Sequence, residues 1–259
     1  MQLSNRLAVI TGGAGGIGAA CARRFAAEGA RLVVVIDLDP AAAEAVAAEI
    51  GGVGYGVDVT DEAALTSLLE RIEDEHGPID VMFSNAGAGI EGGVEAPTEG
   101  WDRLWNLHVM AHVWAARAVL PSMIARGEGH LVQTASAAGL LAAIGSAPYT
   151  VTKHACVSLA EWLSITHHDD GVRVSVLCPQ GVNTAMAPRQ LGDGATDGII
   201  EPEVVAGEVV DAIENERFFI LPHPEVATYV QRKGADPERW LRGMRKLRAR
   251  SLEGLGSGA

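Results

Sequence analysis

A tyrosine and a lysine stand four residues apart in the segment SAPYTVTKHA, at Tyr149 and Lys153. On a helix this spacing places both side chains on one face. A nearby ammonium favours the tyrosinate and lowers the pKa of the phenol, which can then exchange a proton with an alcohol or a carbonyl. The same pair also occurs by chance on helix surfaces. Other residues of the sequence are needed to show whether this pair takes part in catalysis.

A glycine-rich turn, TGGAGGIG at residues 11–18, follows an apolar run at 6–11 and precedes an alanine-rich segment. A strand, a glycine turn and a helix in this order predict a dinucleotide site, because the N–H groups at the helix N-terminus bind a pyrophosphate. A glycine turn without a ligand is the alternative. The residues expected to contact the cofactor here are Thr11, Gly12, Gly16, Ile17 and Gly18.

Two carboxylates end the next apolar runs. Asp37 ends the run at 31–37, where a carboxylate accepts hydrogen bonds from both adenosine ribose hydroxyls and repels a 2′-phosphate, so NAD is expected in preference to NADP. Asp39 competes for this role. Asp58 ends the third run and either reaches the adenine or caps the helix that starts near Asp61.

Composition excludes several classes of function. The 259 residues carry a formal net charge of −13, which argues against nucleic acid as a partner. The sequence has no signal-peptide pattern, no apolar run of membrane-spanning length and no metal-ligand spacing. Cys21, Cys156 and Cys178 are scattered, as expected of buried thiols in a reducing compartment. We expect a cytoplasmic protein.

Apolar runs alternate with helical segments from residue 6 to residue 222, which predicts a parallel sheet covered by helices on both faces. The strands are expected within 6–11, 31–37, 53–60, 79–87, 129–137, 172–180 and 217–222. No linker divides this alternation, so residues 1–222 form one α/β domain.

The motifs TGGAGGIG, DVT (58–60), NAG (85–87), Ser136, YTVTK (149–153) and CPQGVNT (178–184) occur in an order that resembles the short-chain dehydrogenase/reductase family. The resemblance covers about residues 5–222. It implies a single Rossmann-type, doubly wound domain with about seven parallel strands, a nicotinamide cofactor, and hydride exchange between an alcohol and a carbonyl.

The same resemblance assigns roles to individual residues. Tyr149 is the general acid and base, Lys153 supports it and holds the nicotinamide ribose, and Ser136 holds the substrate oxygen. Thr134, on the same strand face, is the weaker candidate for the role of Ser136. Further cofactor contacts are expected from Val59, Asn85, Ala86, Gly87, Pro179, Val182 and Thr184, with Asn85 mainly joining neighbouring strands.

Two positions depart from the family pattern. Gln180 stands where family members usually have glycine, and it either touches the substrate or points to solvent. His108 stands where the family usually has an asparagine that supports a water chain to the lysine. His108 is expected either to take over this part of the proton relay or to serve helix packing only.

The chain after residue 222 has a different character. Residues 231–250 carry eight Lys or Arg against two acidic residues, and Trp240, Met244 and Leu247 form one helical stripe. We expect a basic helical extension at 223–250 that docks on its own or a sister subunit; a membrane surface or an acidic partner is the alternative. Residues 251–259 are expected to be disordered.

Substrate identity is the least determined property. Residues 185–200 are expected to form a lid, and 136–148 the opposite wall, and both are mostly small and apolar. We expect an NAD-dependent oxidoreductase for an apolar alcohol or ketone. It should form a homotetramer or homodimer through the helices that begin near Trp101 and Tyr149. A non-catalytic dinucleotide-binding sensor or scaffold, and an isomerase or dehydratase, are the alternatives.

Overall fold

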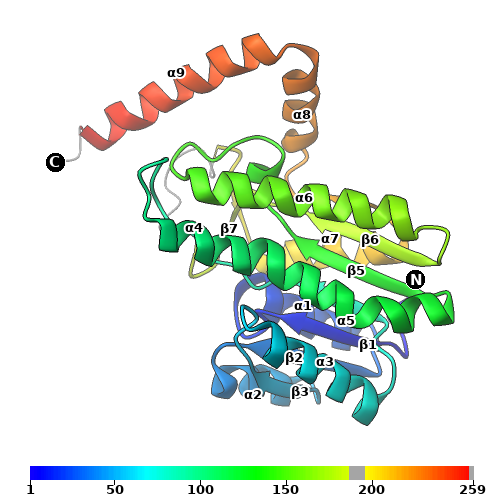
Figure 1. Ribbon diagram of the computed structural model, residues 1–259. Helices are drawn as coiled ribbons and strands as arrows, with labels where there is room; N and C mark the ends of the chain where they lie inside the picture. Colours follow the sequence, from blue (N-terminus) through cyan, green and yellow to red (C-terminus); the bar gives the residue numbers. More distant parts are fainter. Residues whose placement is uncertain (187–195, 257–259) are drawn as a thin grey trace.

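The computed structural model describes residues 1–186 and 196–256, with side chains described as far as residue 250. Seven parallel strands form the main sheet in the order β3-β2-β1-β4-β5-β6-β9 (Figure 1). Their bounds are β1 Leu7–Thr11, β2 Leu32–Asp37, β3 Val53–Gly56, β4 Val81–Ser84, β5 Gly129–Thr134, β6 Val172–Leu177 and β9 Phe219–Ile220. The predicted doubly wound parallel sheet is confirmed.

Helices cover both faces of the sheet and bury two separate apolar cores. One core holds side chains of α1 (Gly16–Ala27), α2 (Pro40–Glu49) and α7 (Pro202–Glu214). The other holds side chains of α3 (Glu62–His76), α5 (Ala111–Arg126) and α6 (Ala147–His167). The strands between them are almost wholly apolar, as a sheet buried on both faces requires.

The helix expected to begin near Trp101 contains an insertion. Its first part, α4 (Thr98–Trp105), continues into a π-helical turn, η1 (Asn106–Met110), and then into α5. The residue pattern does not predict this turn. Such insertions are rare and occur often at functional sites, and this one contains His108.

Short elements follow the carboxyl ends of the strands. A 3₁₀ turn, η2 (Ala137–Gly139), follows β5, and β7 (Gly181–Val182) pairs with β8 (Ile199–Ile200). β8 brings the chain back from the segment expected to be a lid. Of that segment, residues 187–195 lie outside the described residues.

The basic extension forms two helices, α8 (Glu225–Ala235) and α9 (Pro237–Gly256), and α9 reaches away from the sheet (Figure 1). The predicted amphipathic helix over 237–250 is therefore present. It continues through 251–256, which belong to the range expected to be disordered. Residues 257–259 lie outside the described residues.

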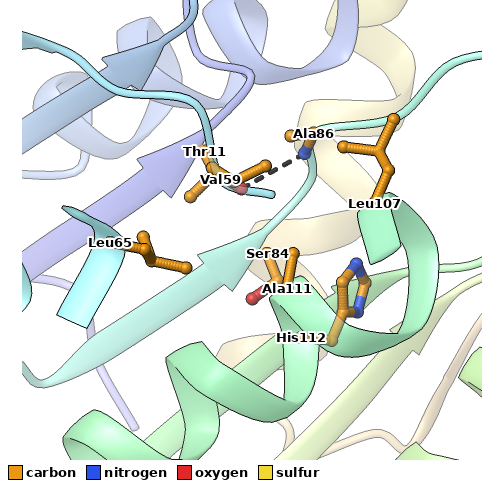
Figure 2. A pocket seen from close by; sticks show the side chains of 8 residues that line it. All are labelled: Thr11, Val59, Leu65, Ser84, Ala86, Leu107, Ala111 and His112. Atoms are coloured by element: carbon orange, nitrogen blue, oxygen red, sulfur yellow. Dashed lines mark hydrogen bonds between the residues drawn. The ribbon is translucent and has the colours of Figure 1, made fainter. Parts of the chain in front are cut away.

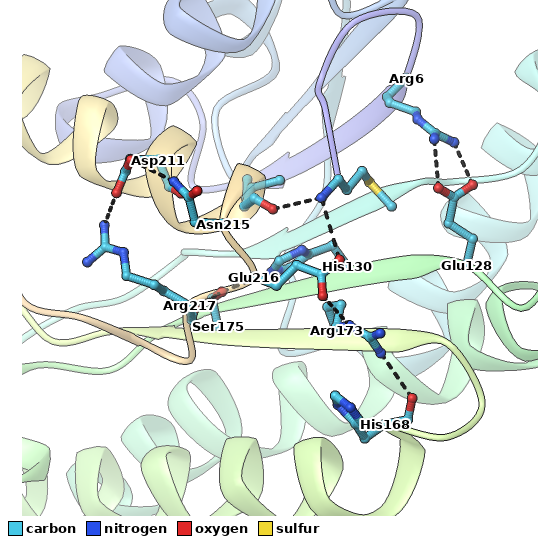
Figure 3. Close-up of polar contacts among 12 residues, drawn as sticks. Arg6, Glu128, His130, His168, Arg173, Ser175, Asp211, Asn215, Glu216 and Arg217 are labelled. Carbon is cyan, nitrogen blue, oxygen red and sulfur yellow. Dashed lines mark hydrogen bonds and ion pairs between the residues drawn. The ribbon is translucent and has the colours of Figure 1, made fainter.

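Charged and polar side chains join the amino ends of the strands, away from the carboxyl edge (Figure 3). The Arg6 guanidinium donates to both carboxylate oxygens of Glu128, at 2.8 and 2.7 Å. Arg173 on β6 pairs with Glu216 at 2.7 Å, and the Ser175 hydroxyl donates to a backbone carbonyl before β9. These contacts fix the strand ends that are remote from the site.

Candidate active site

An open cleft of about 2460 Å³ lies at the carboxyl edge of the sheet. This is the position at which open α/β sheets bind ligands. Of the residues predicted to form the site, all except Thr11 and Gly18 line this cleft. The structure therefore brings together motifs that are spread over more than half of the sequence.

The glycine turn approaches the backbone that follows β4 too closely for larger residues. Gly12 has a φ of +62°, and a Cβ there would lie 2.8 Å from the Ala86 Cα. A Cβ on Gly18 would collide with the Gly12 carbonyl. Gly15, just before α1, has no side chain to cap the helix, and Gly15, Gly16 and Ile17 line the cleft at its N-terminus. This bare helix N-terminus fits a dinucleotide pyrophosphate.

Asn85 and Thr11 join the ends of three strands. The Asn85 amide donates to the carbonyls of Thr11 and Gly12, both at 3.2 Å, and its oxygen accepts from the Thr134 hydroxyl at 3.0 Å. The Thr11 hydroxyl accepts the N–H groups of Asn85 and Ala86. Asn85 thus connects neighbouring strand ends by side-chain hydrogen bonds. The Thr134 hydroxyl is committed to Asn85, which leaves Ser136 as the candidate for holding a substrate oxygen.

Asp37 ends β2 and lines the cleft. The register with β3 runs unbroken as far as Asp37, whose carboxylate accepts the N–H groups of Ala14 at 2.9 Å and Leu38 at 2.8 Å. Asp39 does not compete with it, because the Asp39 carboxylate caps α2. Asp37 therefore links the glycine turn to the position expected for the adenosine ribose.

Asp58 lies beyond the end of β3, which is shorter than expected. Its carboxylate accepts the N–H of Thr60 at 2.9 Å and the Thr60 hydroxyl at 2.7 Å. The cap of α3 is Asp61, whose side chain accepts the N–H of Ala64. Asp58 is thus a turn residue that lines the cleft, and the helix-cap alternative belongs to Asp61.

Ser136, Tyr149 and Lys153 converge from the end of β5 and the first turns of α6. The Lys153 side chain is 2% exposed, its ammonium donates to the Thr134 carbonyl at 2.8 Å, and it lies 5.7 Å from the centre of the Tyr149 ring. The Ser136 hydroxyl accepts the Ala138 N–H at 3.1 Å. Ser146 caps α6 by accepting the Tyr149 N–H, and this fixes the start of the helix.

Burial controls the protonation of these groups. It raises the pKa of the Tyr149 phenol above its ordinary value, and a hydrogen bond with Ser136 acts in the opposite direction. Burial also lowers the pKa of Lys153. The lowering of the Tyr149 pKa that the sequence suggested is not found here, because desolvation of the buried phenol is the larger effect.

His108 is fully buried, and both of its ring nitrogens bind protein groups. Nε2 accepts the Ala88 N–H at 3.2 Å, so Nδ1 carries the proton and donates to the Thr152 hydroxyl at 3.0 Å. Its ring meets the Tyr149 ring edge-on at 5.5 Å. Burial, and then the charge of Lys153, hold the pKa of His108 well below its usual value, so the ring is neutral.

A second histidine lies one turn further along the helix, beside a cavity with room for about one water (Figure 2). His112 Nδ1 lies 3.5 Å from the Cys156 sulfur, and Nε2 has no partner among the described residues. Burial lowers the pKa of His112 to about 3, so it too is neutral. Sequence reasoning missed this residue, although two histidines four apart on an apolar helix were a visible signal.

Gln180 lines the cleft, so its expected contact with the substrate stays a prediction, while its side chain also binds the protein. Its amide donates to the Asp197 carboxylate at 2.9 Å, and its backbone N–H donates to His223 Nδ1 at 3.3 Å. The side chain therefore points to the segment that returns from the expected lid. Together with Pro179, whose carbonyl accepts the Ala137 N–H at 2.9 Å, it fixes the chain beside Ser136.

The described residues contain no cluster of side chains suited to a metal ion. Among the same residues, no helix has the length and apolar character needed to cross a membrane.

A family model described as short chain dehydrogenase matches residues 6–193. The chain is 38% identical to 1-deoxy-11-beta-hydroxypentalenate dehydrogenase of Streptomyces exfoliatus over 241 residues, which covers 87% of this chain and 86% of that protein. It is 33% identical to meso-2,3-butanediol dehydrogenase of Serratia marcescens over 232 residues, with 85% and 92% covered.

A solved structure of a short chain dehydrogenase/reductase from Burkholderia phymatum in complex with NAD matches with a TM-score of 0.83 and 29% identity, covering 92% of this chain and 96% of that one. The cleft, the motifs and these relatives agree on one activity. The protein is an oxidoreductase that acts on CH–OH groups of secondary alcohols and binds a nicotinamide dinucleotide. The chain belongs to the short-chain dehydrogenase/reductase family.

Proposed function

We propose that this protein oxidises an apolar secondary alcohol, or reduces the corresponding ketone, with NAD. Tyr149 is the general acid and base, Ser136 holds the substrate oxygen, and Lys153 holds the nicotinamide ribose. The observation that carries the proposal is the convergence of these three side chains in the same cleft as the glycine turn and Asp37. When bound, the dinucleotide supplies the hydride acceptor or donor.

The proton step follows from the burial of Tyr149. A phenol with a raised pKa is protonated at neutral pH, so Tyr149 is ready to donate to a carbonyl oxygen. Alcohol oxidation needs the deprotonated form, so its rate should rise with pH. Lys153 is held by the Thr134 carbonyl on the same side of the ring and stabilises the tyrosinate as it forms.

The decisive experiment is a panel of secondary alcohols and ketones followed by nicotinamide absorbance, with the wild type and Tyr149→Phe. The variant keeps the ring but loses the proton donor, so kcat should fall about 10²-fold or more while NADH binding is unchanged. Tyr55→Phe, at the far end of the sheet, is the matched control and should be fully active. Near-normal turnover in Tyr149→Phe would refute the mechanism.

The same panel separates the alternatives. A non-catalytic dinucleotide-binding protein would bind NADH but oxidise none of the alcohols. An isomerase or dehydratase would form product without net change in nicotinamide absorbance.

We also infer three properties of the working enzyme. NAD is preferred to NADP because of the Asp37 carboxylate at the ribose position. Neutral His108 supports the proton pathway by holding the loop after β4 against α6. The enzyme works in the cytoplasm as a homotetramer or homodimer, which the apolar side chains exposed on α6 support.

A further inference from the structure

α8 is fixed to the segment that returns from the expected lid. The Tyr229 hydroxyl donates to Asp197 Oδ1 at 2.8 Å, while Asp197 Oδ2 accepts the Gln180 amide at 2.9 Å. One carboxylate thus joins α8 to the chain beside Ser136. Val226 is fully buried at the start of the same helix.

One turn later, α8 is fixed to the opposite wall of the cleft. The Lys233 ammonium donates to the backbone carbonyls of Leu140 at 2.7 Å and Leu141 at 3.3 Å, and it lies 3.5 Å from His154 Nε2. Tyr229 and Lys233 are four residues apart, so both belong to one helix face. This face of α8 bridges the two sides of the cleft.

Arg232 shares this face and lines the cleft. Three further arginines line the cleft, Arg103 on α4 and Arg239 and Arg250 on α9, and like Arg232 they are exposed. Among the described residues no carboxylate forms an ion pair with any of the four; the ion pairs of the chain lie elsewhere. The sequence drew attention to the basic extension but did not place any of it at the cleft.

Besides Asp37 and Asp58, the carboxylates among the described residues that line the cleft are Glu91 and Asp236. The Asp236 carboxylate accepts the Arg239 N–H at the start of α9. Asp37 and Asp58 lie at the cofactor end. A cationic surface within a chain of net charge −13 runs against the average composition of the protein, and it points to an anionic ligand.

Much of the remaining lining of the cleft is apolar. It includes Leu141, Ala142 and Ala143 on one side and Trp240 and Met244 on the other. Such a lining suits a hydrocarbon body, and a guanidinium binds carboxylate or phosphate oxygens in a fork. Arg232 is the best placed of the four, because its helix is the one held to both walls.

We propose that the substrate carries an anionic oxygen group, remote from the reacting carbinol, on an apolar body, and that Arg232 binds this group. This inference rests on the proposed dehydrogenase function and narrows its substrate class to apolar hydroxy acids or phosphate esters. It also makes the C-terminal extension part of the substrate site.

The test uses ligands that cannot react, so it does not depend on turnover. Decanoate, decyl phosphate, 1-aminodecane and methyl decanoate are titrated into the complex of the full-length protein with NADH, and the change in NADH fluorescence gives each dissociation constant. An anionic ligand should bind at least about tenfold more tightly than the ester or the amine, since a hydrogen bond between charged groups contributes about this factor. Whichever of decanoate and decyl phosphate binds more tightly identifies the anionic group.

Arg232→Gln should remove this preference and leave the binding of methyl decanoate and NADH unchanged. The matched control is Arg245→Gln, an exposed arginine of α9 that does not line the cleft. Equal binding of acid and ester by the wild type, or an unchanged preference in Arg232→Gln, would overturn the inference. Failure of the dehydrogenase proposal would show separately, as absence of turnover in the alcohol panel.

Discussion

At the scale of single residues, Asp37 is a carboxylate whose orientation is fixed by backbone N–H groups. Two N–H groups, from the glycine turn and from the residue after β2, hold it at the strand end. We expect Asp37→Ala to lower the ratio of kcat/KM for NAD over NADP by about tenfold or more, because the variant loses the ribose acceptor and the charge that repels a 2′-phosphate. Steady-state kinetics with both cofactors measures this ratio.

Asp39→Ala is the matched control for this change. It removes the cap of α2, so it should lower stability by about 1 kcal/mol without altering the cofactor ratio. A wild-type enzyme that uses NADP as well as NAD would contradict the assignment.

His108 connects the π-turn η1 to the loop after β4 and to α6. His108→Leu would leave the Ala88 N–H without its acceptor, so we expect kcat to fall at least about tenfold, whereas His108→Asn should keep much of the activity. Because the pKa of His108 lies well below its usual value, any acid limb from its protonation should fall below the normal histidine range. A pH–rate profile of wild type and His108→Asn tests this.

Measuring both the melting temperature and kcat of His108→Leu separates a role in turnover from a role in helix packing. If His108→Leu only loosens the fold, its melting temperature falls but its kcat at low temperature equals that of wild type. That result would assign the histidine to packing alone.

Residue types and their order were enough to predict most of the candidate site residues that line the cleft. The glycines, Asn85 and Tyr149 each have one physical task that few other residues can perform. The partners of Gln180 and His108 could not be predicted in the same way. Gln180 binds Asp197, seventeen residues along the chain, and His108 binds Thr152 on another helix, so both depend on the tertiary fold.

At the scale of elements, α6 presents an apolar stripe to solvent. Val151, Trp162 and Ile165 lie on one helical face and are 47%, 59% and 82% exposed. The sequence also suggests surplus apolar surface on the helix that begins near Trp101, at Trp105, Val109, Val113 and Trp114. Val109 and Trp114 are instead buried, whereas Trp105 is 44% exposed.

We therefore expect an interface between copies of this chain to include α6. Trp162→Glu combined with Ile165→Glu should lower the molar mass found by light scattering at micromolar concentration, since two charges would be buried against a partner. Val94→Glu, at an exposed loop residue, is the control and should leave the mass unchanged. A monomeric wild type would contradict the expected homo-oligomer.

Strand and helix positions followed from apolar periodicity, because a sheet buried on both faces requires continuous apolar strands. The π-turn and the course of α8 could not be predicted from this periodicity. A single inserted residue barely alters the helical pattern, and the anchors of α8 are backbone carbonyls and one carboxylate far away in sequence.

At the scale of the whole molecule, buried histidines should make stability depend on pH. Burial lowers the pKa of both His112 and His130 to about 3. The unfolded chain takes up these protons near pH 6.5 and the folded chain does not, so the free energy of unfolding should fall as pH drops from about 6.5 towards 3. The slope is about 1.4 kcal/mol per pH unit for each histidine.

Urea unfolding at pH 5.0 and 7.5 measures this dependence. His130→Gln should reduce the loss of stability on acidification relative to wild type, whereas the exposed His168→Gln should not. Identical losses in wild type and His130→Gln would exclude the buried histidine as a source.

The bridging position of α8 also bears on how such an enzyme could diversify. The residues expected to face the dinucleotide occur no later than Thr184. Tyr229 and Arg232 occur more than forty residues further on and line the same cleft, and Lys233 binds its wall at Leu140. Sequence drift in the last part of the chain can therefore change which molecule is chosen while the redox partner stays the same. Relatives that share the first two hundred residues and differ in the extension would form a series with one coenzyme and many substrates.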